Sequence, residues 1–196
     1  MNGIVLAGGE SRRMGRDKAF LNVAGLPMIE HVIRALRSVA RHIIVVTNTP
    51  EAYARYDVEV TGDVKDRRGS LVGLYSGLLR SSQDCNIVVA CDMPFLNPGL
   101  LSYMAGLAEG HDAVVPKLGE LVEPLHAVYR RSLLRVIEES ISRDQWRIRS
   151  VLSGQRTRYV TEEEIDRFDP LRRSFINLNT RKEYEEVTCS DLDCRS

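Results

Sequence analysis

The sequence has no long hydrophobic run and no excess of charge of either sign. Nowhere do about 18 apolar residues follow one another, so no membrane-spanning helix is predicted. The N-terminal residues carry no basic segment and too short an apolar stretch for a secretion signal, and we expect a cytoplasmic location. The 27 Lys and Arg residues balance 27 Asp and Glu residues, which argues against nucleic acid as a partner because nucleic-acid-binding proteins normally carry a basic excess.

Cysteine is also scarce and irregularly spaced. None of the four cysteines shows a Cys-x-x-Cys pair or another metal-ligand spacing, so we expect free thiols in a reducing compartment. Cys189 and Cys194 lie in a polar tail, where pairing or metal binding is an alternative to a frayed end, and we predict that residues 188–196 are disordered. No repeat or linker composition divides the rest, so residues 1–187 are predicted to form a single domain.

What the sequence does contain is an alternation of short β-branched runs with segments of helical periodicity. The runs are mostly apolar on both faces, as buried parallel strands are. This rhythm predicts an α/β fold, a Rossmann-like three-layer α/β/α sandwich with a mostly parallel twisted sheet. Ligands on such sheets bind beyond the C-terminal ends of the strands. The predicted strands are Ile4–Ala7, His42–Thr47, Val58–Val60, Ile87–Cys91, Ala113–Val115, Ala127–Tyr129 and Arg158–Val160. The predicted helices are a segment with Pro27 as its first residue, Leu71–Leu79, Pro98–Leu107, Ser132–Ile141 and two that start at Thr161 and Thr180.

The first predicted strand leads into a loop rich in glycine and cations, residues 6–18. Its adjacent glycines Gly8 and Gly9 allow a close approach of the backbone to a ligand and an inward turn of the N–H groups. Arg13 and Lys18 add the positive charge that a polyphosphate needs. The loop has neither the Lys-Ser/Thr of a P-loop nor the spacing of a dinucleotide-binding loop. A plain glycine turn with solvated cations is the alternative that the glycine pair alone leaves open.

Polar residues also follow the later predicted strands. Asp92 comes directly after the most apolar strand, and Pro94 prevents that strand from continuing. A carboxylate at this edge suits Mg²⁺, which proteins usually hold through one or two carboxylates plus substrate phosphates, although an aspartate that forms a turn or caps a helix is the alternative. Asn48 and Asp63 follow two other strands, where turn formation is the simpler interpretation of the residues alone.

The loop at residues 6–18 resembles the signature loop of nucleotidyltransferases, most of all that of the molybdenum cofactor guanylyltransferases. Residues 90–96, Ala-Cys-Asp-Met-Pro-Phe-Leu, resemble the metal-binding segment of that family. The resemblance implies a nucleotide-diphospho-sugar-transferase-like fold and a transfer of GMP from GTP to the phosphate of molybdopterin or its molybdenum form. It implies Mg²⁺ as cofactor and catalytic roles for Arg13, Lys18 and Asp92. The nucleotide-binding residues that it implies are Leu6, Ala7, Gly8, Gly9, Lys18, Asn48, Asp63 and Asp92, of which Asp92 also binds the metal.

Three other functions stay open at this point. A molybdopterin cytidylyltransferase and a sugar- or alditol-phosphate nucleotidyltransferase share the same loop chemistry. The segment Arg68–Leu74 is expected to pack against the base of the nucleotide, and its residues Ser70 and Val72 depart from the family pattern. A non-catalytic nucleotide-binding module is the third, but such a module needs no metal carboxylate. The resemblance also implies other proteins of molybdenum-cofactor biosynthesis or acceptor proteins as partners.

The acceptor side is less well defined. Asn177 and Asn179 alternate on a predicted strand and would share one face, and the resemblance implies that both hold the acceptor. His126 is predicted to face core packing or acceptor contacts rather than act as a base. No protein base is needed, because an attacking phosphate is already ionised at neutral pH. Arg147 and Arg149 are predicted to lie on a solvated helix face, with contact to the acceptor phosphate as the alternative.

Overall fold

The structure is a computed structural model that describes residues 1–8, 18–65 and 69–179. Its centre is an eight-stranded sheet. Seven strands follow the order β10-β7-β9-β6-β1-β4-β5, and the eighth, β8, pairs with β7. Neighbouring strands are parallel except at β9, which runs antiparallel to β6 and β7, and at β8. A separate hairpin joins β2 and β3. The mostly parallel sheet that the sequence predicts is therefore confirmed. The strands are β1 (Asn2–Leu6), β2 (Asn22–Val23), β3 (Leu26–Pro27), β4 (Ile43–Val46), β5 (Glu59–Thr61), β6 (Cys85–Ala90), β7 (Ala113–Leu118), β8 (Leu121–Val122), β9 (His126–Arg130) and β10 (Thr157–Val160).

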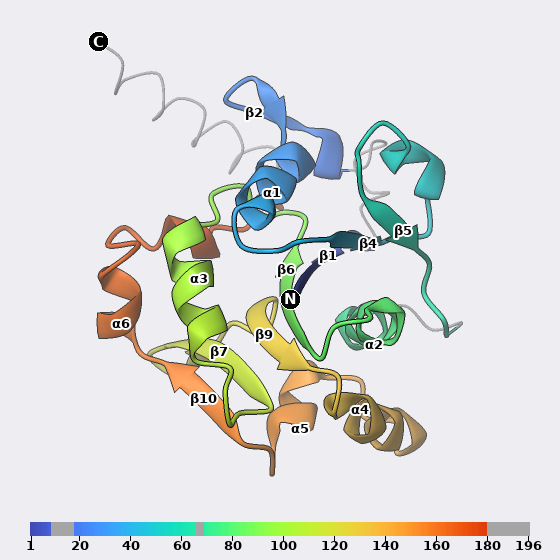
Figure 1. The fold of residues 1–196 in the computed structure, drawn as a ribbon, viewed down its shortest axis with the longest axis vertical. Coiled ribbons are helices and arrows are strands. Elements are labelled where there is room, and N and C mark those ends of the chain that lie inside the picture. Colours follow the sequence, from blue (N-terminus) through green and yellow to red (C-terminus); the bar gives the residue numbers. More distant parts are fainter. Residues whose placement is uncertain (9–17, 66–68, 180–196) are drawn as a thin grey trace.

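Helices cover both faces of the sheet and complete the predicted three layers (Figure 1). Neighbouring residues of the central strand face opposite cores, because side chains alternate along a strand. Val5 packs in the core beneath α1 and α3, while Ile4 packs in the core beneath α2 and α4. The helices are α1 (Met28–Arg37), α2 (Ser70–Arg80), α3 (Pro98–Gly106), α4 (Leu133–Ser142), α5 (Ile148–Leu152) and α6 (Glu162–Asp166), with the 3-10 helices η2 (Lys18–Phe20), η3 (Pro50–Tyr53) and η4 (Arg173–Phe175). No helix in the described part of the chain is long and apolar enough to cross a membrane.

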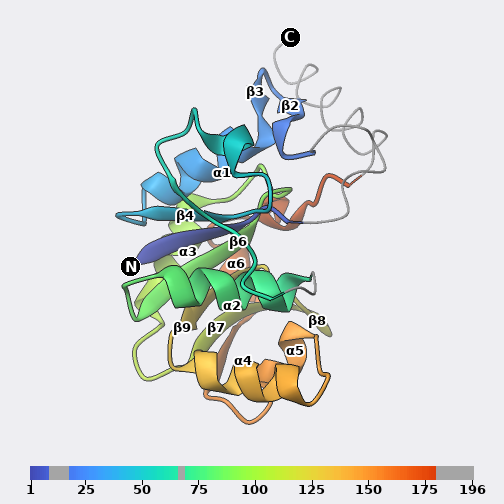
Figure 2. The same ribbon diagram turned by 90° about the vertical axis from the view of Figure 1, so that its right-hand side faces the viewer.

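The strand order reverses at β1, which lies between β4 and β6 and runs parallel to both. The chain therefore leaves β1 and β6 at the same end of the sheet, where the C-terminal ends of the strands lie. Such a switch point opens a crevice for ligands outside the carboxyl ends of the strands. Figure 2 shows the sheet edge-on between its helical layers. The residues that follow β1, β4, β5 and β6 are thus brought to one side of the molecule.

Two local predictions are wrong. Pro27 is not the first residue of α1 but its N-cap, in an extended conformation with φ −56° and ψ 141°. The residues around Asn177 and Asn179 form no strand: after η4 the chain is irregular to Asn179, where the description stops before Thr180. Its backbone bonds to a loop instead of a strand ladder, since Leu178 N donates to Asp92 O at 3.0 Å. The capping box predicted at Thr161 is confirmed.

Gly77 in α2 marks the closest approach of a helix to the sheet. A Cβ added there would lie 2.4 Å from Ile4 Cγ2, whereas one at Gly73 would lie 3.4 Å from Leu6 Cδ2, an ordinary contact. We expect Gly77→Ala to lower the free energy of unfolding by about 1–3 kcal/mol through overpacking. Gly73→Ala is the matched control, and its better helix propensity should leave stability equal or higher. Urea denaturation of both variants measures the difference, and equal stabilities would contradict the packing argument.

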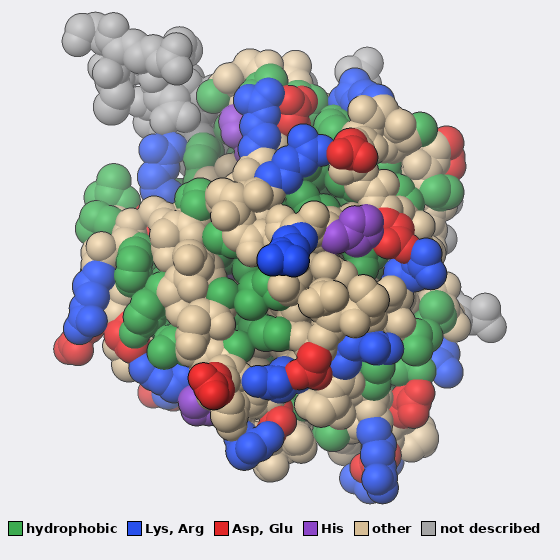
Figure 3. Space-filling view, viewed as in Figure 1, with side chains coloured by type: hydrophobic (Ala, Val, Ile, Leu, Met, Phe, Trp, Pro, Cys, Tyr) green, Lys and Arg blue, Asp and Glu red, His purple; other side chains and the backbone are tan. Residues whose placement is uncertain are grey.

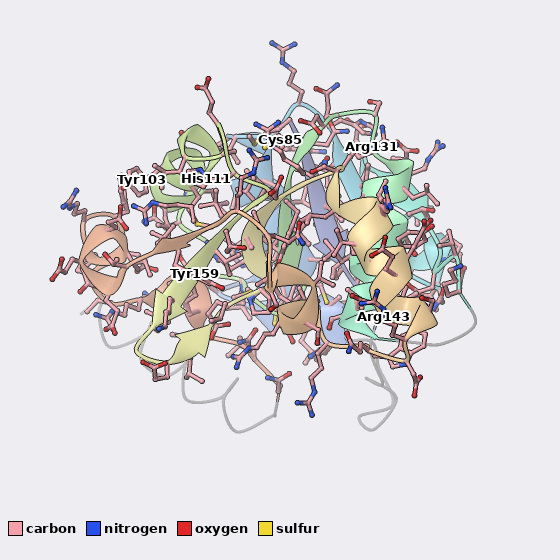
Figure 4. All side chains as sticks on the ribbon, turned by 90° about the horizontal axis from the view of Figure 1, so that it is seen from below. Cys85, Tyr103, His111, Arg131, Arg143 and Tyr159 are labelled. Carbon is pink, nitrogen blue, oxygen red and sulfur yellow. The ribbon has the colours of Figure 1, made fainter. Side chains whose placement is uncertain are left out.

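Glu164 in α6 joins three elements through hydrogen bonds. Its carboxylate accepts from Tyr103 Oη at 2.5 Å, from Arg158 Nη2 at 2.5 Å and from Thr161 N at 2.9 Å. Burial of the carboxylate opposes ionisation, but these hydrogen bonds outweigh it and lower the pKa of Glu164 from 4.5 to about 2. Figure 4 labels Tyr103, which reaches Glu164 from α3.

We expect Glu164→Gln to destabilise the fold at neutral pH by about 1 kcal/mol, allowing for solvent screening. The folded-state pKa lies below the unfolded one, so the contribution is fully present above the unfolded pKa. It should fade as the pH falls from 4.5 toward 2, where the folded carboxyl itself becomes protonated. Urea unfolding at pH 7 and pH 3 measures this dependence. Glu163→Gln, at an exposed position of the same turn, is the control. A pH-independent difference between Glu164→Gln and the unsubstituted chain would refute this account of the stability.

Candidate functional site

Three polar side chains meet at the switch point. Lys18 opens η2 in the segment after β1, Asp92 follows β6, and Asn179 ends the irregular C-terminal stretch. Lys18 Nζ donates to Asp92 Oδ2 at 2.5 Å and to Asn179 Oδ1 at 2.8 Å. The partners lie 74 and 161 positions from Lys18 along the chain, so only the fold brings them together. The site therefore holds a cation between two oxygen acceptors, at the C-terminal ends of the strands, where ligands of α/β sheets bind.

The second carboxylate oxygen of Asp92 is the group that points to a metal. Asp92 Oδ1 is buried and has no hydrogen-bond partner among the described residues. A buried carboxylate oxygen without a partner is costly, and a divalent cation would satisfy it. The described residues contain no cluster of three or more His, Cys, Asp or Glu side chains able to hold a metal by themselves. The oxygen therefore fits Mg²⁺, which takes its remaining ligands from water and substrate phosphates.

Asn48 and Asp63 form a second pair beside this site. They exchange two hydrogen bonds, from Asn48 Nδ2 to Asp63 Oδ2 at 2.9 Å and from Asp63 N to Asn48 Oδ1 at 3.2 Å. Each residue thus fixes the orientation of the other. A Cβ added at Gly8 would lie 3.9 Å from Asp63 Oδ2, which places the loop after β1 next to the pair. The residues after β1, β4 and β5 therefore form one continuous rim.

The other residues predicted for the phosphate loop differ in what the structure says of them. Leu6 and Ala7 are buried at the end of β1, and the amide of Ala7 donates to Val46 O at 2.9 Å. Gly8 is exposed, as a residue that approaches a ligand through its backbone must be. Gly9 and Arg13 lie outside the described residues.

The residues predicted for the acceptor side have different partners in the structure. Asn179 contacts Lys18, whereas Asn177 Nδ2 donates to Phe175 O at 3.4 Å. His126 is fully buried with its ring 4.9 Å from that of Phe175, and burial lowers its pKa to about 4, so it is neutral at pH 7. The prediction of a packing histidine is confirmed. Arg149 is exposed on α5 and donates to Val122 O, as expected of a solvated helix face.

Sequence reasoning missed a buried polar cluster that fastens the C-terminal stretch to the loop carrying Asp92. Asp169 accepts from Arg173 N at 3.0 Å and from Ser174 N at 2.7 Å. Ser174 Oγ in turn accepts from Asn97 N at 2.9 Å. We call Asn97, Asp169 and Ser174 the anchor cluster. The dipeptides Asn97-Pro98 and Asp169-Pro170 are turn signals that mark two of the positions. They give no hint that the two turns meet.

The opposite end of the strands also carries paired charges, since the Glu59 carboxylate contacts His42 and Arg80. On the face seen in Figure 3, basic and acidic side chains are interspersed. Cys85 begins β6 at this end of the strands, and Figure 4 shows it on the same side as Arg131. Cys85 and Cys91 form no disulfide in the described part of the chain, in agreement with the prediction of thiols, while Cys189 and Cys194 lie outside the described residues.

Comparison with known proteins connects this geometry with a family. The model of the MobA-like NTP transferase domain matches residues 3–162. A molybdenum cofactor guanylyltransferase of Desulfosudis oleivorans is 39% identical over 95% of this chain and 94% of its own length. One of Syntrophotalea carbinolica is 36% identical over 93% of this chain and 88% of its own. The crystal structure of molybdopterin-guanine dinucleotide biosynthesis protein A from Archaeoglobus fulgidus superimposes with a TM-score of 0.84 at 29% identity, over 97% of this chain and all of that one. A 2-C-methyl-D-erythritol 4-phosphate cytidylyltransferase from Thermus thermophilus, at 18% identity and a TM-score of 0.71, shares the fold.

Proposed function

Because the chain belongs to the MobA-like NTP transferase family, we propose that it transfers GMP from GTP to the phosphate of molybdopterin or its molybdenum form. The products are the molybdopterin guanine dinucleotide cofactor and pyrophosphate. The observation that carries the proposal is the convergence of Lys18, Asp92 and Asn179 at the switch point of the sheet. A cation and a carboxylate with an unsatisfied oxygen are what a metal-assisted reaction of a triphosphate requires.

The proposed reaction is an in-line displacement at the α-phosphorus of GTP. An oxygen of the acceptor phosphate forms the new bond, the bond from the α-phosphorus to the bridging oxygen of the β-phosphate breaks, and pyrophosphate leaves with that electron pair. The attacking oxygen is already ionised at neutral pH, so the protein need not supply a base. This agrees with a buried, neutral His126 that takes no part in proton transfer.

The chain contributes position and charge. Lys18 and Arg13 neutralise the phosphates, and the loop at Gly8 and Gly9 offers backbone amides. Asp92 holds Mg²⁺ through Oδ1, and the metal, when bound, supplies Lewis-acid stabilisation of the charge that develops on the phosphates. Of these residues, Gly8 and Lys18 follow β1 and Asp92 follows β6, so a triphosphate across the strand ends would meet all three.

The same arrangement supports a place for the base and the acceptor. Asp63, oriented by Asn48, accepts from N1–H and N2–H₂ of guanine, a donor pair that adenine and cytosine do not present together. Asn179, beside Lys18, and Asn177 contact the acceptor. The further partners we propose are other proteins of molybdenum-cofactor biosynthesis or acceptor proteins, which would deliver or receive the pterin.

The test is direct synthesis. Purified protein is incubated with Mg²⁺, molybdopterin and GTP, and the guanine dinucleotide cofactor and pyrophosphate are measured. We expect product from GTP, and CTP in place of GTP is the control. Formation of the cytosine dinucleotide in preference would reject the guanylyl assignment. A thermal-shift comparison of GTP, CTP, UTP and ATP with Mg²⁺ should show the largest stabilisation by GTP, because at equal concentration the ligand that binds the folded state most tightly stabilises it most.

A further inference from the structure

We propose that Lys18 stands in for the divalent cation in the nucleotide-free protein. Its ammonium stays paired with the Asp92 carboxylate until a triphosphate offers it a new partner. The metal therefore binds to Asp92 together with the nucleotide rather than before it. This inference rests on the proposed function, since it concerns the metal and the nucleotide of that reaction. It adds an order of binding that the roles of the single residues do not contain.

The first support is the position of the ammonium. Lys18 Nζ lies 2.5 Å from Asp92 Oδ2 and 2.8 Å from Asn179 Oδ1. Both side chains of the ion pair are largely shielded, with 22% of Lys18 and 13% of Asp92 exposed. Two oxygen atoms held against one cation form the kind of environment that a hard metal ion also prefers. The ammonium thus lies where two oxygen ligands for a metal are already held together.

The second support is the asymmetry of the Asp92 carboxylate. Oδ2 is engaged by Lys18, while the buried Oδ1 has no hydrogen-bond partner among the described residues. A metal that approaches Oδ1 therefore comes within a few ångströms of the ammonium. The two cations repel each other strongly where water is scarce. A single carboxylate whose charge is already neutralised by Lys18 is a poor site for Mg²⁺, which gives up its bound water reluctantly.

A triphosphate removes both obstacles at once. Its oxygens provide the additional ligands that the metal lacks, and their negative charge gives Lys18 a new partner. Release of Lys18 from Asp92 then exposes the full carboxylate charge to the metal. Metal and nucleotide consequently bind with positive coupling, and each raises the affinity for the other by the same factor.

This exchange of cations is tested by the affinity for Mn²⁺ in the absence of nucleotide. The free Mn²⁺ signal in electron paramagnetic resonance is titrated with the unsubstituted chain, with Lys18→Met and with Lys18→Arg. We expect Lys18→Met, which removes the charge, to bind Mn²⁺ at least about tenfold more tightly, equivalent to about 1.4 kcal/mol. Lys18→Arg keeps the charge and should bind as weakly as the unsubstituted chain. Lys18→Ala provides a second uncharged variant should Lys18→Met fold poorly.

A double variant, Lys18→Met with Asp92→Asn, assigns the site and should lose the gain. The proposal is overturned if the uncharged variants bind Mn²⁺ no more tightly than the unsubstituted chain, or if the double variant keeps the gain. These outcomes do not depend on turnover. Synthesis of the dinucleotide by a chain whose Lys18 variants fail the Mn²⁺ test would reject the cation exchange alone. Tighter Mn²⁺ binding without any dinucleotide synthesis would reject guanylyl transfer alone.

Discussion

Asp92→Ala should abolish guanylyl transfer, with a loss of about 1,000-fold or more in kcat, while the fold stays intact. The substitution removes Oδ1, the buried oxygen available to a metal, and also the partner of Lys18. The phosphates would then lose the metal that stabilises their developing charge. The fold should survive because the link to the C-terminal stretch uses the carbonyl of Asp92, which accepts from Leu178 N and is unchanged by the substitution.

Two further variants make this result specific. Asp92→Asn keeps the shape and one oxygen but not the charge, and we expect nearly the same loss of kcat. Asp112→Asn is the matched control, since Asp112 is also an ion-paired aspartate, bound to Arg156 at 2.9 Å at the start of β7. Its kcat should equal that of the unsubstituted chain. Steady-state pyrophosphate release with GTP and molybdopterin measures all of these variants, and near-normal turnover by Asp92→Ala would disprove the metal assignment.

The layered fold could be predicted because its signals are local. Buried parallel strands such as β1, β4 and β6 appear as short apolar runs, and the periodicity of α1 and α4 differs plainly from theirs. The antiparallel direction of β9 could not be predicted in this way. A strand of the same composition fits the sheet in either direction, and its direction depends on connections that only the assembled fold determines.

The candidate site shows the same limit at the level of single residues. Lys18 and Asp92 were predictable one by one, since each follows an apolar strand and strand ends of a parallel sheet meet at one edge. Their direct contact was not, because it depends on where the assembled fold places Lys18 relative to the C-terminal end of β6. The alternation of Asn177 and Asn179 predicts a strand, but the stretch that ends in Asn179 is irregular. Leu178 N donates to Asp92 O and so holds this stretch against the loop after β6. The two residues are far apart in the sequence, and their contact has no local signature.

The anchor cluster should matter for catalysis as well as for stability. Asp169 is 7% exposed and Ser174 is fully buried, so the Ser174 amide that donates to Asp169 has no access to water as an alternative. We expect Asp169→Ala to lower the free energy of unfolding by about 1–3 kcal/mol, the cost of leaving a buried donor unpaired. The stretch that ends in Asn179 would also lose its fixed position over Asp92. The kcat of Asp169→Ala should therefore fall by more than the loss of folded protein explains, with a smaller change in the KM for GTP.

The control and the measurement separate position from stability. Asp166 lies three residues before Asp169 and pairs with the side chain of Arg172 at the surface, so Asp166→Asn should leave kcat unchanged. Thermal unfolding gives the temperature up to which Asp169→Ala remains folded, and kcat and KM are measured below that temperature. A defect that follows only the unfolded fraction would mean that the anchor cluster supports the fold alone. We expect instead a fall in kcat in fully folded Asp169→Ala that is absent from Asp166→Asn. This result would show that the anchor cluster holds Asn179 against Lys18. The geometry around the Lys18 ammonium would then depend on buried contacts outside the site.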